Sequence, residues 1–204
     1  MKAGSAGLVA TALVTLLGVG AFWSSTDGFT AFTAETARRA DVLRNPRSLP
    51  AAALEDQDGR RFSLQDYQGR LLAVEFIYTR CTTVCRSLGM ALRQVRERLP
   101  AQALGREVAL LSISFDAARD DPASLKAYGQ AFGADGAQWR IARIRNPDEV
   151  APLLAAFGVV VIADGLGGFE HNAAIHLLGR DGKLAQISDI DQPLEFADRI
   201  ARSL

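Results

Sequence analysis

Strand-like and helix-like segments alternate along most of this chain, and the alternation limits the folds open to it. Three runs of apolar, branched or aromatic residues have the length and composition of buried strands, at positions 71–78, 108–115 and 175–178. Amphipathic helix patterns occupy positions 87–99, 122–132, 147–157 and 193–204. Asp-Gly pairs at 58–59 and 181–182 predict two tight hairpin turns. This order predicts an α/β domain with a mixed central sheet flanked by helices.

The composition suits one ordinary domain with appendages. The chain has 204 residues, of which 49% are hydrophobic, so it can bury a sizeable core. Lysine and arginine together number 23, as do aspartate and glutamate, and the formal net charge is 0. Because there is neither a basic excess nor an acidic tail, we expect no nucleic-acid partner.

The amino-terminal segment carries no charge between Lys2 and Asp27. Positions 8–23 read LVATALVTLLGVGAFW, and about twenty such residues can cross a hydrocarbon core of about 30 Å. Trp23 suits the lipid–water interface. A cleaved secretory signal is one interpretation, with small residues at 18–20 before the cut, but an uncleaved transmembrane anchor fits the length and Trp23 better. In both cases Lys2 stays inside and the rest is exported.

These features predict three parts: a membrane anchor or signal segment at 1–26, a stalk at 27–49 with one short helix around 34–43, and a domain at 50–204. We expect the domain to lie outside the cytoplasm, on the periplasmic side of the inner membrane. Outside the cytoplasm, thiols are driven toward disulfides unless a metal or a reductant holds them.

The chain has two cysteines, Cys81 and Cys85, and they lie within five residues of sequence. A strand that leads into a helix carrying a cysteine at its start is the layout of thioredoxin-like folds. The helix amino terminus stabilises a thiolate, and Arg80 and Arg86 add positive charge. At this spacing the two α-carbons lie about 6 Å apart, within disulfide range. The pair can therefore form a redox disulfide, Cys81–Cys85, or offer two soft ligands to one metal ion.

Other uses of the two cysteines fit less well. A purely structural disulfide would close a loop of three residues and would stabilise the fold little. A closed zinc site needs four ligands, and the chain adds only two histidines, one of which looks buried. Thr79 and Val74 do not match the threonine and proline positions of a peroxiredoxin. Met90 could supply a thioether, but packing on the helix face is the more common role.

The two histidines have different surroundings. His176 lies inside a strand pattern, where packing is the usual role. His171 precedes that strand and follows the glycine-rich segment 164–168, which reads as flexible. In a thioredoxin-like fold this approach lies opposite the cysteines, where redox members carry a cis-proline. Two thiolates with one imidazole make a three-coordinate soft site, which Cu(I) prefers and Cu(II) accepts.

The chain resembles the Sco/SenC family of copper proteins that assist cytochrome c oxidase assembly. The resemblance covers about residue 49 to the carboxyl end, together with the single amino-terminal anchor. It rests on these matching segments: Tyr78-Thr79 with Cys81 and Cys85, SISFD at 112–116, RDDP at 119–122, Tyr128 to Phe132-Gly133 and Trp139, and His171 followed by Arg180-Asp181-Gly182.

The resemblance implies that Cys81, Cys85 and His171 bind a copper ion, and that Asp116 supports the site without binding the ion. It implies a membrane-tethered metallochaperone that delivers copper to the oxidase copper centre. The expected partners are the copper-receiving subunit of a respiratory oxidase and a thiol reductant or copper donor protein. This reading makes the chain a binding protein rather than an enzyme.

The chain departs from the family pattern at several positions. The family has proline after each cysteine, where this chain has Thr82 and Arg86, and aspartate before the histidine, where it has Glu170. Glu75 is an acid inside an apolar strand, six residues before Cys81. Thioredoxins carry a buried acid at this spacing that moves protons for the cysteine pair, and burial would raise its pKa. Otherwise Glu75 reaches solvent or pairs with an arginine.

Glu75 therefore supports a second hypothesis, that of a thiol–disulfide oxidoreductase. Such an enzyme would reduce the cysteines of the copper-receiving protein before the metal arrives. Cys81 would attack, Cys85 would resolve the mixed disulfide, and Glu75 would transfer the proton. A third hypothesis is a redox or copper sensor whose surface is read by another protein.

Overall fold

The computed structural model describes residues 3–26, 28, 33–81 and 84–204. Thr82, which replaces the proline after the first cysteine, lies outside the described residues. The chain divides into two compact units, Met1–Arg44 and Asn45–Leu204, and each is described by itself.

The first unit contains two helices, α1 (Ala3–Ser25) and α2 (Ala34–Arg44). Within the described residues, α1 is the one helix whose length and composition would let it cross a membrane. Its span Gly7–Ser25 has a mean hydropathy of 1.8, and none of it is buried. Helix α2 confirms the short helix expected in the stalk. Its Glu35 accepts hydrogen bonds from Arg38 at 2.6 Å and Arg39 at 2.8 Å, which are the ion pairs that helical spacing favours.

The second unit is built on a seven-stranded sheet in the order β2-β1-β5-β4-β3-β8-β9. Its strands are β1 (Leu54–Asp56), β2 (Arg61–Phe62), β3 (Leu71–Ile77), β4 (Val108–Ser114), β5 (Trp139–Ile144), β8 (Ile175–Leu178) and β9 (Leu184–Ser188). Strands β3, β4 and β5 run parallel, whereas β8 pairs antiparallel with β3. The sheet is therefore mixed, as the sequence predicts.

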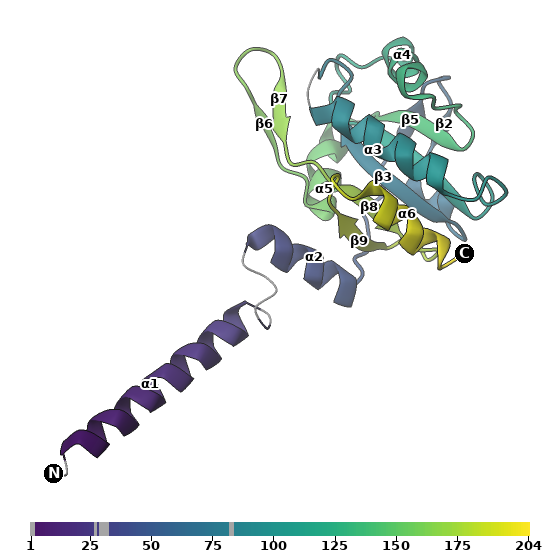
Figure 1. Cartoon of the computed structure of the whole chain (residues 1–204). Helices are drawn as coiled ribbons and strands as arrows, with labels where there is room; N and C mark the ends of the chain where they lie inside the picture. Colours follow the sequence, from purple (N-terminus) through teal and green to yellow (C-terminus); the bar gives the residue numbers. More distant parts are fainter. Residues whose placement is uncertain (1–2, 27, 29–32, 82–83) are drawn as a thin grey trace. The chain divides into compact units, whose positions relative to one another are not determined.

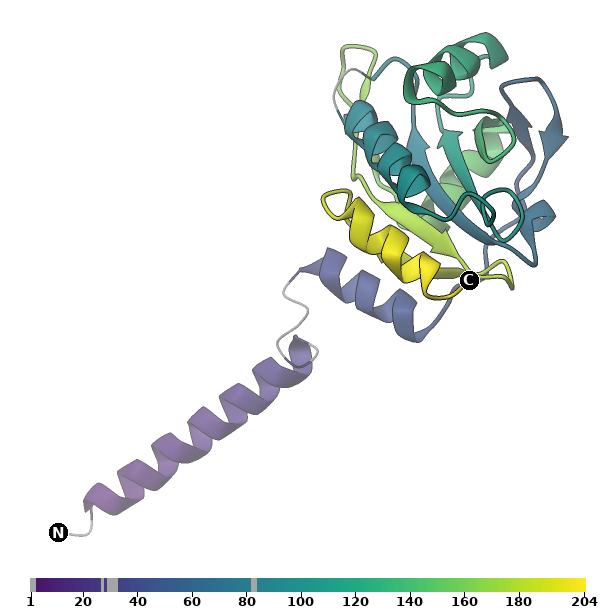
Figure 2. The same cartoon turned by 45° about the vertical axis from the view of Figure 1, so that its right-hand side comes forward.

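Helices cover both faces of this sheet (Figures 1 and 2). They are α3 (Val84–Arg98), α4 (Pro122–Phe132), α5 (Pro147–Phe157) and α6 (Pro193–Ala201), and a 3-10 turn, η1 (Leu64–Tyr67), precedes β3. Both views show α3 beside α6 on one face and α5 on the other. On the α5 side, Phe76 of β3 meets Phe157 edge to face, with ring centroids 4.9 Å apart. Neighbouring residues on a strand point to opposite faces, so Glu75 faces the side covered by α3.

The bounds of α4 and α5 agree with the sequence because their capping residues act as expected. Asp121 and Asn146 accept backbone N–H bonds at the two starts, and Gly133 and Gly158 end the helices with φ of 82° and 69°. The other bounds differ more. Helix α3 begins at Val84 rather than at 87, and α6 ends at Ala201 rather than at 204.

Strand β5 is absent from the sequence prediction because arginines interrupt its apolar pattern. Arg143 donates to Glu55 of β1 at 2.6 and 2.8 Å, and the Arg140 guanidinium lies 4.6 Å from the centre of the Phe62 ring. Both side chains cover the neighbouring strands while Trp139, Ile141 and the other inward residues fill the core.

The glycine-rich segment before His171 is the turn of a β-hairpin, which the sequence analysis did not predict. Strands β6 (Val161–Ala163) and β7 (Phe169–His171) pair antiparallel, and the hairpin projects beyond the body of the sheet (Figure 1). Asp164 closes the turn by accepting backbone N–H bonds from Leu166 at 2.7 Å and Gly168 at 2.9 Å.

Candidate functional site

A buried aspartate fixes the loop that leads from β3 to the first cysteine. Asp120 is fully buried, and its carboxylate accepts hydrogen bonds from the Thr79 backbone N–H at 2.8 Å and the Thr79 hydroxyl at 2.6 Å. The Ser114 hydroxyl donates a third bond at 2.5 Å. Asp120 thus joins the loop before Cys81 to the end of β4. The sequence analysis assigned Asp120 no role, although an acid that closely follows a buried strand is a signal for one.

The two cysteines lie at the start of α3, and both are in the thiol state. Cys81 is 7% exposed and Cys85 is fully buried. The backbone N–H of Cys85 points to Cys81 Sγ at 3.4 Å, so the Cys81 sulfur lies at the amino terminus of the helix. Tyr128 of α4 donates its hydroxyl to the Cys85 carbonyl at 2.9 Å and holds this end of α3 in place.

The thiol of Cys85 is hard to ionise in this environment. Burial is the main cause that raises its pKa, and the nearby Cys81 and Glu75 raise it further. A metal ion bound by Cys85 would therefore have to displace a proton from it.

The structure brings His171 to Cys85. His171 Nε2 lies 3.4 Å from Cys85 Sγ, and His171 Nδ1 lies 3.3 Å from the Asn172 carbonyl oxygen. With the proton on Nδ1, donated to that carbonyl, Nε2 presents its lone pair to the sulfur. Burial lowers the pKa of His171, and the bond to Asn172 offsets this only in part. A neutral imidazole is the form that binds metals.

Three aromatic side chains hold the imidazole in place. The His171 ring lies 5.3 Å from the Phe115 ring and 6.5 Å from the Tyr78 ring, and Phe169 contacts both of these aromatic rings. The Tyr78 hydroxyl donates to the Phe169 carbonyl at 3.0 Å and accepts from the Phe169 N–H at 3.2 Å. Tyr78 thus docks strand β7 onto the end of β3.

Asp116 lies just after the end of β4 and pairs with two arginines, Arg80 and Arg119. It is 6% exposed, and its Oδ2 lies 3.2 Å from Arg80 and 3.6 Å from Arg119. Both arginines also donate to the Gly167 carbonyl in the hairpin turn, at 2.9 and 3.2 Å. Asp116 therefore aligns two cations that hold the hairpin carrying His171. Asp116 can therefore help to position His171 without itself contacting a metal ion.

The donor atoms suit one soft metal ion. At bond lengths of about 2.3 Å for thiolate and about 2.0 Å for imidazole, a sulfur and a nitrogen on one ion lie about 3.5–3.7 Å apart at tetrahedral to trigonal angles. The 3.4 Å between Cys85 Sγ and His171 Nε2 is close to that separation. Within the described part of the chain, no three His, Cys, Asp or Glu side chains already form a complete metal-binding group. A three-ligand site therefore requires the donor atoms of Cys81, Cys85 and His171 to come closer together than they lie here.

Glu75 is fully buried in β3, so the alternative of a solvent-exposed or arginine-paired glutamate is wrong. Its Oε1 accepts a hydrogen bond from the Ser112 hydroxyl at 2.6 Å, and Trp139 Nε1 donates to that hydroxyl at 2.9 Å. Its Oε2 has no hydrogen-bond partner among the described residues. Burial raises the pKa of Glu75 to about 8, and the Ser112 bond opposes the rise.

The two remaining candidates lie outside this cluster. His176 is packed in the core, with its ring 5.8 Å from Phe76 and 5.1 Å from Phe157, as the sequence predicts. Met90 is 46% exposed, so the expectation that it packs on the helix face is wrong.

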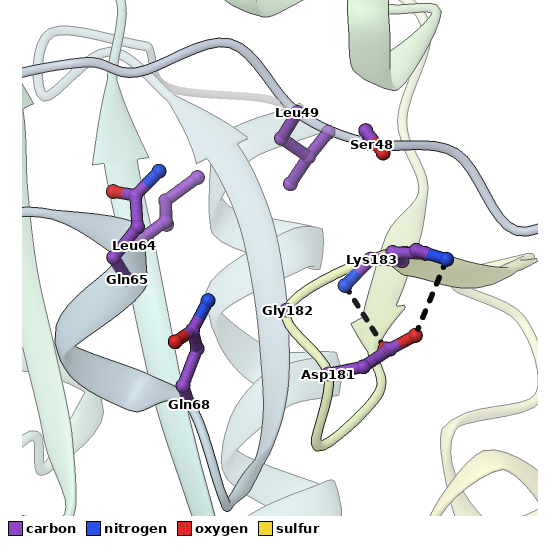
Figure 3. A pocket seen from close by; sticks show the side chains of 8 residues that line it. All are labelled: Ser48, Leu49, Leu64, Gln65, Gln68, Asp181, Gly182 and Lys183. Carbon is purple, nitrogen blue, oxygen red and sulfur yellow. Dashed lines mark hydrogen bonds and ion pairs between the residues drawn. The ribbon is translucent and has the colours of Figure 1, made fainter.

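A separate polar pocket of about 170 Å³ lies beside η1 and the β8–β9 turn (Figure 3). Gln65 and Gln68 face it from one side, and Asp181 and Lys183 face it from the other. The Lys183 N–H donates to Asp181 Oδ1 at 3.1 Å, and Nζ lies 3.8 Å from Oδ2. This pocket is at the amino end of β3, whereas Cys81 follows the carboxyl end, so it is no part of the thiol and imidazole cluster.

Comparison with known proteins gives a consistent set of similarities. The model of the SCO1/SenC family matches residues 48–204. The SCO1 protein homolog of Bacillus subtilis (strain 168) is 26% identical over 132 residues, which are 64% of this chain and 67% of the homolog.

Solved structures show the same fold. Bradyrhizobium japonicum ScoI with copper bound is 26% identical, with a TM-score of 0.64 over 77% of this chain and 100% of that one. BsSco, a Sco-family cytochrome c oxidase assembly protein in which a disulfide switch was identified, is 21% identical, with a TM-score of 0.63 over 78% and 95% of the two chains. These similarities confirm the thioredoxin-like fold.

Proposed function

Because this chain belongs to the SCO1/SenC family, we propose that it binds one copper ion through Cys81, Cys85 and His171. One observation carries the proposal: Cys85 Sγ and His171 Nε2 lie 3.4 Å apart, close to the separation of two ligands on one ion. Two sulfurs and one imidazole are soft ligands, which favour Cu(I). The ion is cargo rather than a resident cofactor.

Each ligand has a defined task in this proposal. The Cys81 sulfur lies at the helix amino terminus, where a thiolate is favoured. The Cys85 proton leaves when the ion binds, and the neutral His171 offers Nε2. Cargo then passes to a partner by ligand exchange, as the partner's thiols replace Cys81 and Cys85 one at a time.

We further propose a metallochaperone that is tethered to the membrane by α1 and delivers copper to the copper centre of cytochrome c oxidase. The apolar span Gly7–Ser25 and the preceding Lys2 support a tether at 1–26, a linker at 27–49 and a domain at 50–204 on the periplasmic side. The recipient would be the copper-receiving subunit. A copper donor would reload the protein, and a thiol reductant would return a Cys81–Cys85 disulfide to the dithiol form that binds copper.

Glu75 favours a second candidate function, thiol–disulfide exchange with the copper-receiving protein. In that reaction the Cys81 thiolate attacks a disulfide of the partner and releases one partner thiol. Cys85 then attacks the Cys81 sulfur, which releases the second thiol and leaves the Cys81–Cys85 disulfide. The buried Glu75 lies on the α3 side of the sheet and would take up the Cys85 proton. The partner gains the two electrons that the chain loses.

A copper titration of the full chain in detergent micelles tests the proposed function. The reduced chain should bind one copper ion with a visible or near-ultraviolet thiolate absorption band, and thiol blocking should abolish that band. A reduced chain that binds no copper would contradict the metallochaperone proposal and leave dithiol exchange as the function.

A further inference from the structure

A groove runs between α3 and α4 and begins at the Cys81 sulfur. Near the cysteine, a hollow of about 390 Å³ is lined by Cys81, Arg86, Ala127, Tyr128, Ala131 and Phe132 among others. A second hollow of about 500 Å³ continues toward the carboxyl end of α3, with Arg93, Leu99 and Leu104 in its wall. The two hollows share Ala131 and Phe132 in their linings, so they adjoin along the α3–α4 side, and we call the pair the α3–α4 groove.

The sequence explains the shape of this groove. Gly89 of α3 lets the Phe132 ring lie flat against the helix, because a Cβ at that position would come within 2.8 Å of the ring. Ala127 and Ala131 are exposed and one helical turn apart, so the rim on α4 is low. An aromatic floor with a low rim leaves room for an extended segment of another chain.

The length of the groove sets the size of what fits. Helix α3 has 15 residues and is therefore about 22 Å long. An extended chain advances about 3.3 Å per residue, so about seven residues would span the groove.

Arg86 gives the groove its charge preference. It is exposed beside Cys81, and it makes no ion pair with any residue that the structure describes. By contrast, Arg93 pairs with Glu97 at 2.8 Å and Arg96 pairs with Asp135 at 3.2 Å. The uncompensated cation therefore lies at the end of the groove where the thiol is.

We propose that the α3–α4 groove binds an extended, acidic, cysteine-containing segment of the protein that exchanges copper or disulfides with Cys81. The proposal rests on the exchange at Cys81 proposed above and adds its docking surface. The segment's cysteine meets the Cys81 sulfur, its acidic side chain pairs with Arg86, and its backbone passes over Ala127 and Ala131. The partner then approaches from the α3–α4 side.

Exchange kinetics with defined probes test the groove. The reduced full chain in detergent micelles reacts with mixed disulfides of thionitrobenzoate and three thiols. These thiols are a peptide of about seven residues with glutamates beside its cysteine, the same peptide with glutamines, and N-acetylcysteine amide. Cys81 attacks the peptide sulfur, and thionitrobenzoate leaves as a coloured thiolate. In Cys85→Ser the mixed disulfide with Cys81 is trapped, and its mass identifies the reacting sulfur.

The rate constant of each peptide is divided by the rate constant of the N-acetylcysteine amide probe, so that any change in the reactivity of the Cys81 thiol cancels. We expect the acidic peptide to react about three- to fivefold faster than the neutral one, as one exposed ion pair allows. Arg86→Glu should remove or reverse this preference. Ala131→Gln should slow both peptides severalfold and leave the small probe unchanged.

Matched controls carry the same changes elsewhere. Arg61→Glu alters an exposed arginine on β2, and Ala151→Gln alters an exposed alanine on α5, so neither should change the ratios. A preference that survives Arg86→Glu, or peptide ratios that survive Ala131→Gln, would overturn the groove proposal. Copper titration of the wild-type chain separates the two proposals. Copper binding by the wild type, with rate ratios that Arg86→Glu and Ala131→Gln leave unchanged, rejects only the groove. Absence of copper binding by the wild type, with the expected rate ratios, rejects only the copper site.

Discussion

Cys85 Sγ and His171 Nε2 lie 3.4 Å apart, although 86 positions separate the two residues in the chain. The contact depends on two features that meet at the carboxyl end of β3. One is the start of α3, where Tyr128 bonds to the Cys85 carbonyl and Asp120 holds the loop before Cys81 through Thr79. The other is the β6–β7 hairpin, which Tyr78 docks through two hydrogen bonds to Phe169. We therefore expect the affinity for copper to depend on the contacts that hold the β6–β7 hairpin against β3.

His171→Ala should lower copper affinity more than about tenfold, which is roughly 1.4 kcal/mol, because it removes the imidazole ligand. The fold should persist, since His171 lies in the β6–β7 hairpin, outside the seven-stranded sheet. Competition with a Cu(I) chelator measures the affinity, and circular dichroism checks the fold. Glu170→Ala, an exposed neighbour on the same strand, is the control and should change little. An affinity within tenfold of wild type in His171→Ala would remove this residue from the ligand set.

Tyr78→Phe should loosen the hairpin without removing a ligand. The change deletes the hydroxyl that bonds to both backbone groups of Phe169, which we expect to cost about 1 kcal/mol of stability. Amide hydrogen exchange in β6 and β7 should become faster, and copper affinity should fall by less than in His171→Ala. Tyr67→Phe is the matched control, because Tyr67 lies on η1 away from the hairpin. Unchanged exchange in β7 would show that Tyr78 does not dock the hairpin.

Asp120→Asn should destabilise the fold by about 2–3 kcal/mol, because one oxygen that accepts buried hydrogen bonds becomes an N–H donor. The neighbouring Asp121→Asn is the control. Asp121 caps α4 at the surface, and asparagine caps helices about as well as aspartate. Urea unfolding followed by circular dichroism compares the two. Equal midpoints for both variants would contradict the assigned role of Asp120.

Glu75 should make stability depend on pH in a defined direction. Its pKa is raised from 4.5 to about 8 in the folded state, so the folded chain binds a proton that the unfolded chain has lost. The stabilising effect of the protonated carboxyl is complete below about pH 4.5 and is lost as pH rises toward 8. Glu75→Gln should therefore gain stability relative to wild type across this range. If the free energies of unfolding of the two proteins changed in parallel with pH, the pKa of Glu75 would not be raised in the folded state.

The same variant separates the two candidate functions. Glu75→Gln should slow disulfide exchange with a model dithiol, since a proton acceptor near Cys85 is gone, but it should spare copper binding. Stopped-flow exchange at roughly pH 6–9 measures the first effect, and copper titration measures the second. Equal exchange rates across that range would remove Glu75 from the mechanism.

Local patterns predict much of this fold. The bounds of α4 and α5 follow from Asp121, Asn146 and the glycines that end the helices, and β3 and β4 follow from runs that are mostly apolar. Strand β5 could not be found in this way, because its arginines lie over neighbouring strands that are distant in sequence. The hairpin was missed because short strands around a glycine-rich turn are stable only when docked, here by Tyr78.

The candidate site shows the same limit. Spacing alone places the two cysteines on one helix start, and the family resemblance suggests His171 as a third ligand. The role of Asp120 depends on three donors that come from the β3 exit loop and the end of β4, which no periodic pattern encodes. The burial of Glu75 follows from its place in a central strand, but its bond to Ser112 depends on the register between β3 and β4.

X-ray absorption spectroscopy at the copper edge of the loaded full chain identifies the atoms that bind the ion. We expect copper bound to two sulfurs and one imidazole nitrogen in the wild type, with the imidazole scattering lost in His171→Ala. A wild-type spectrum with two sulfurs and no imidazole, unchanged in His171→Ala, would contradict this expectation.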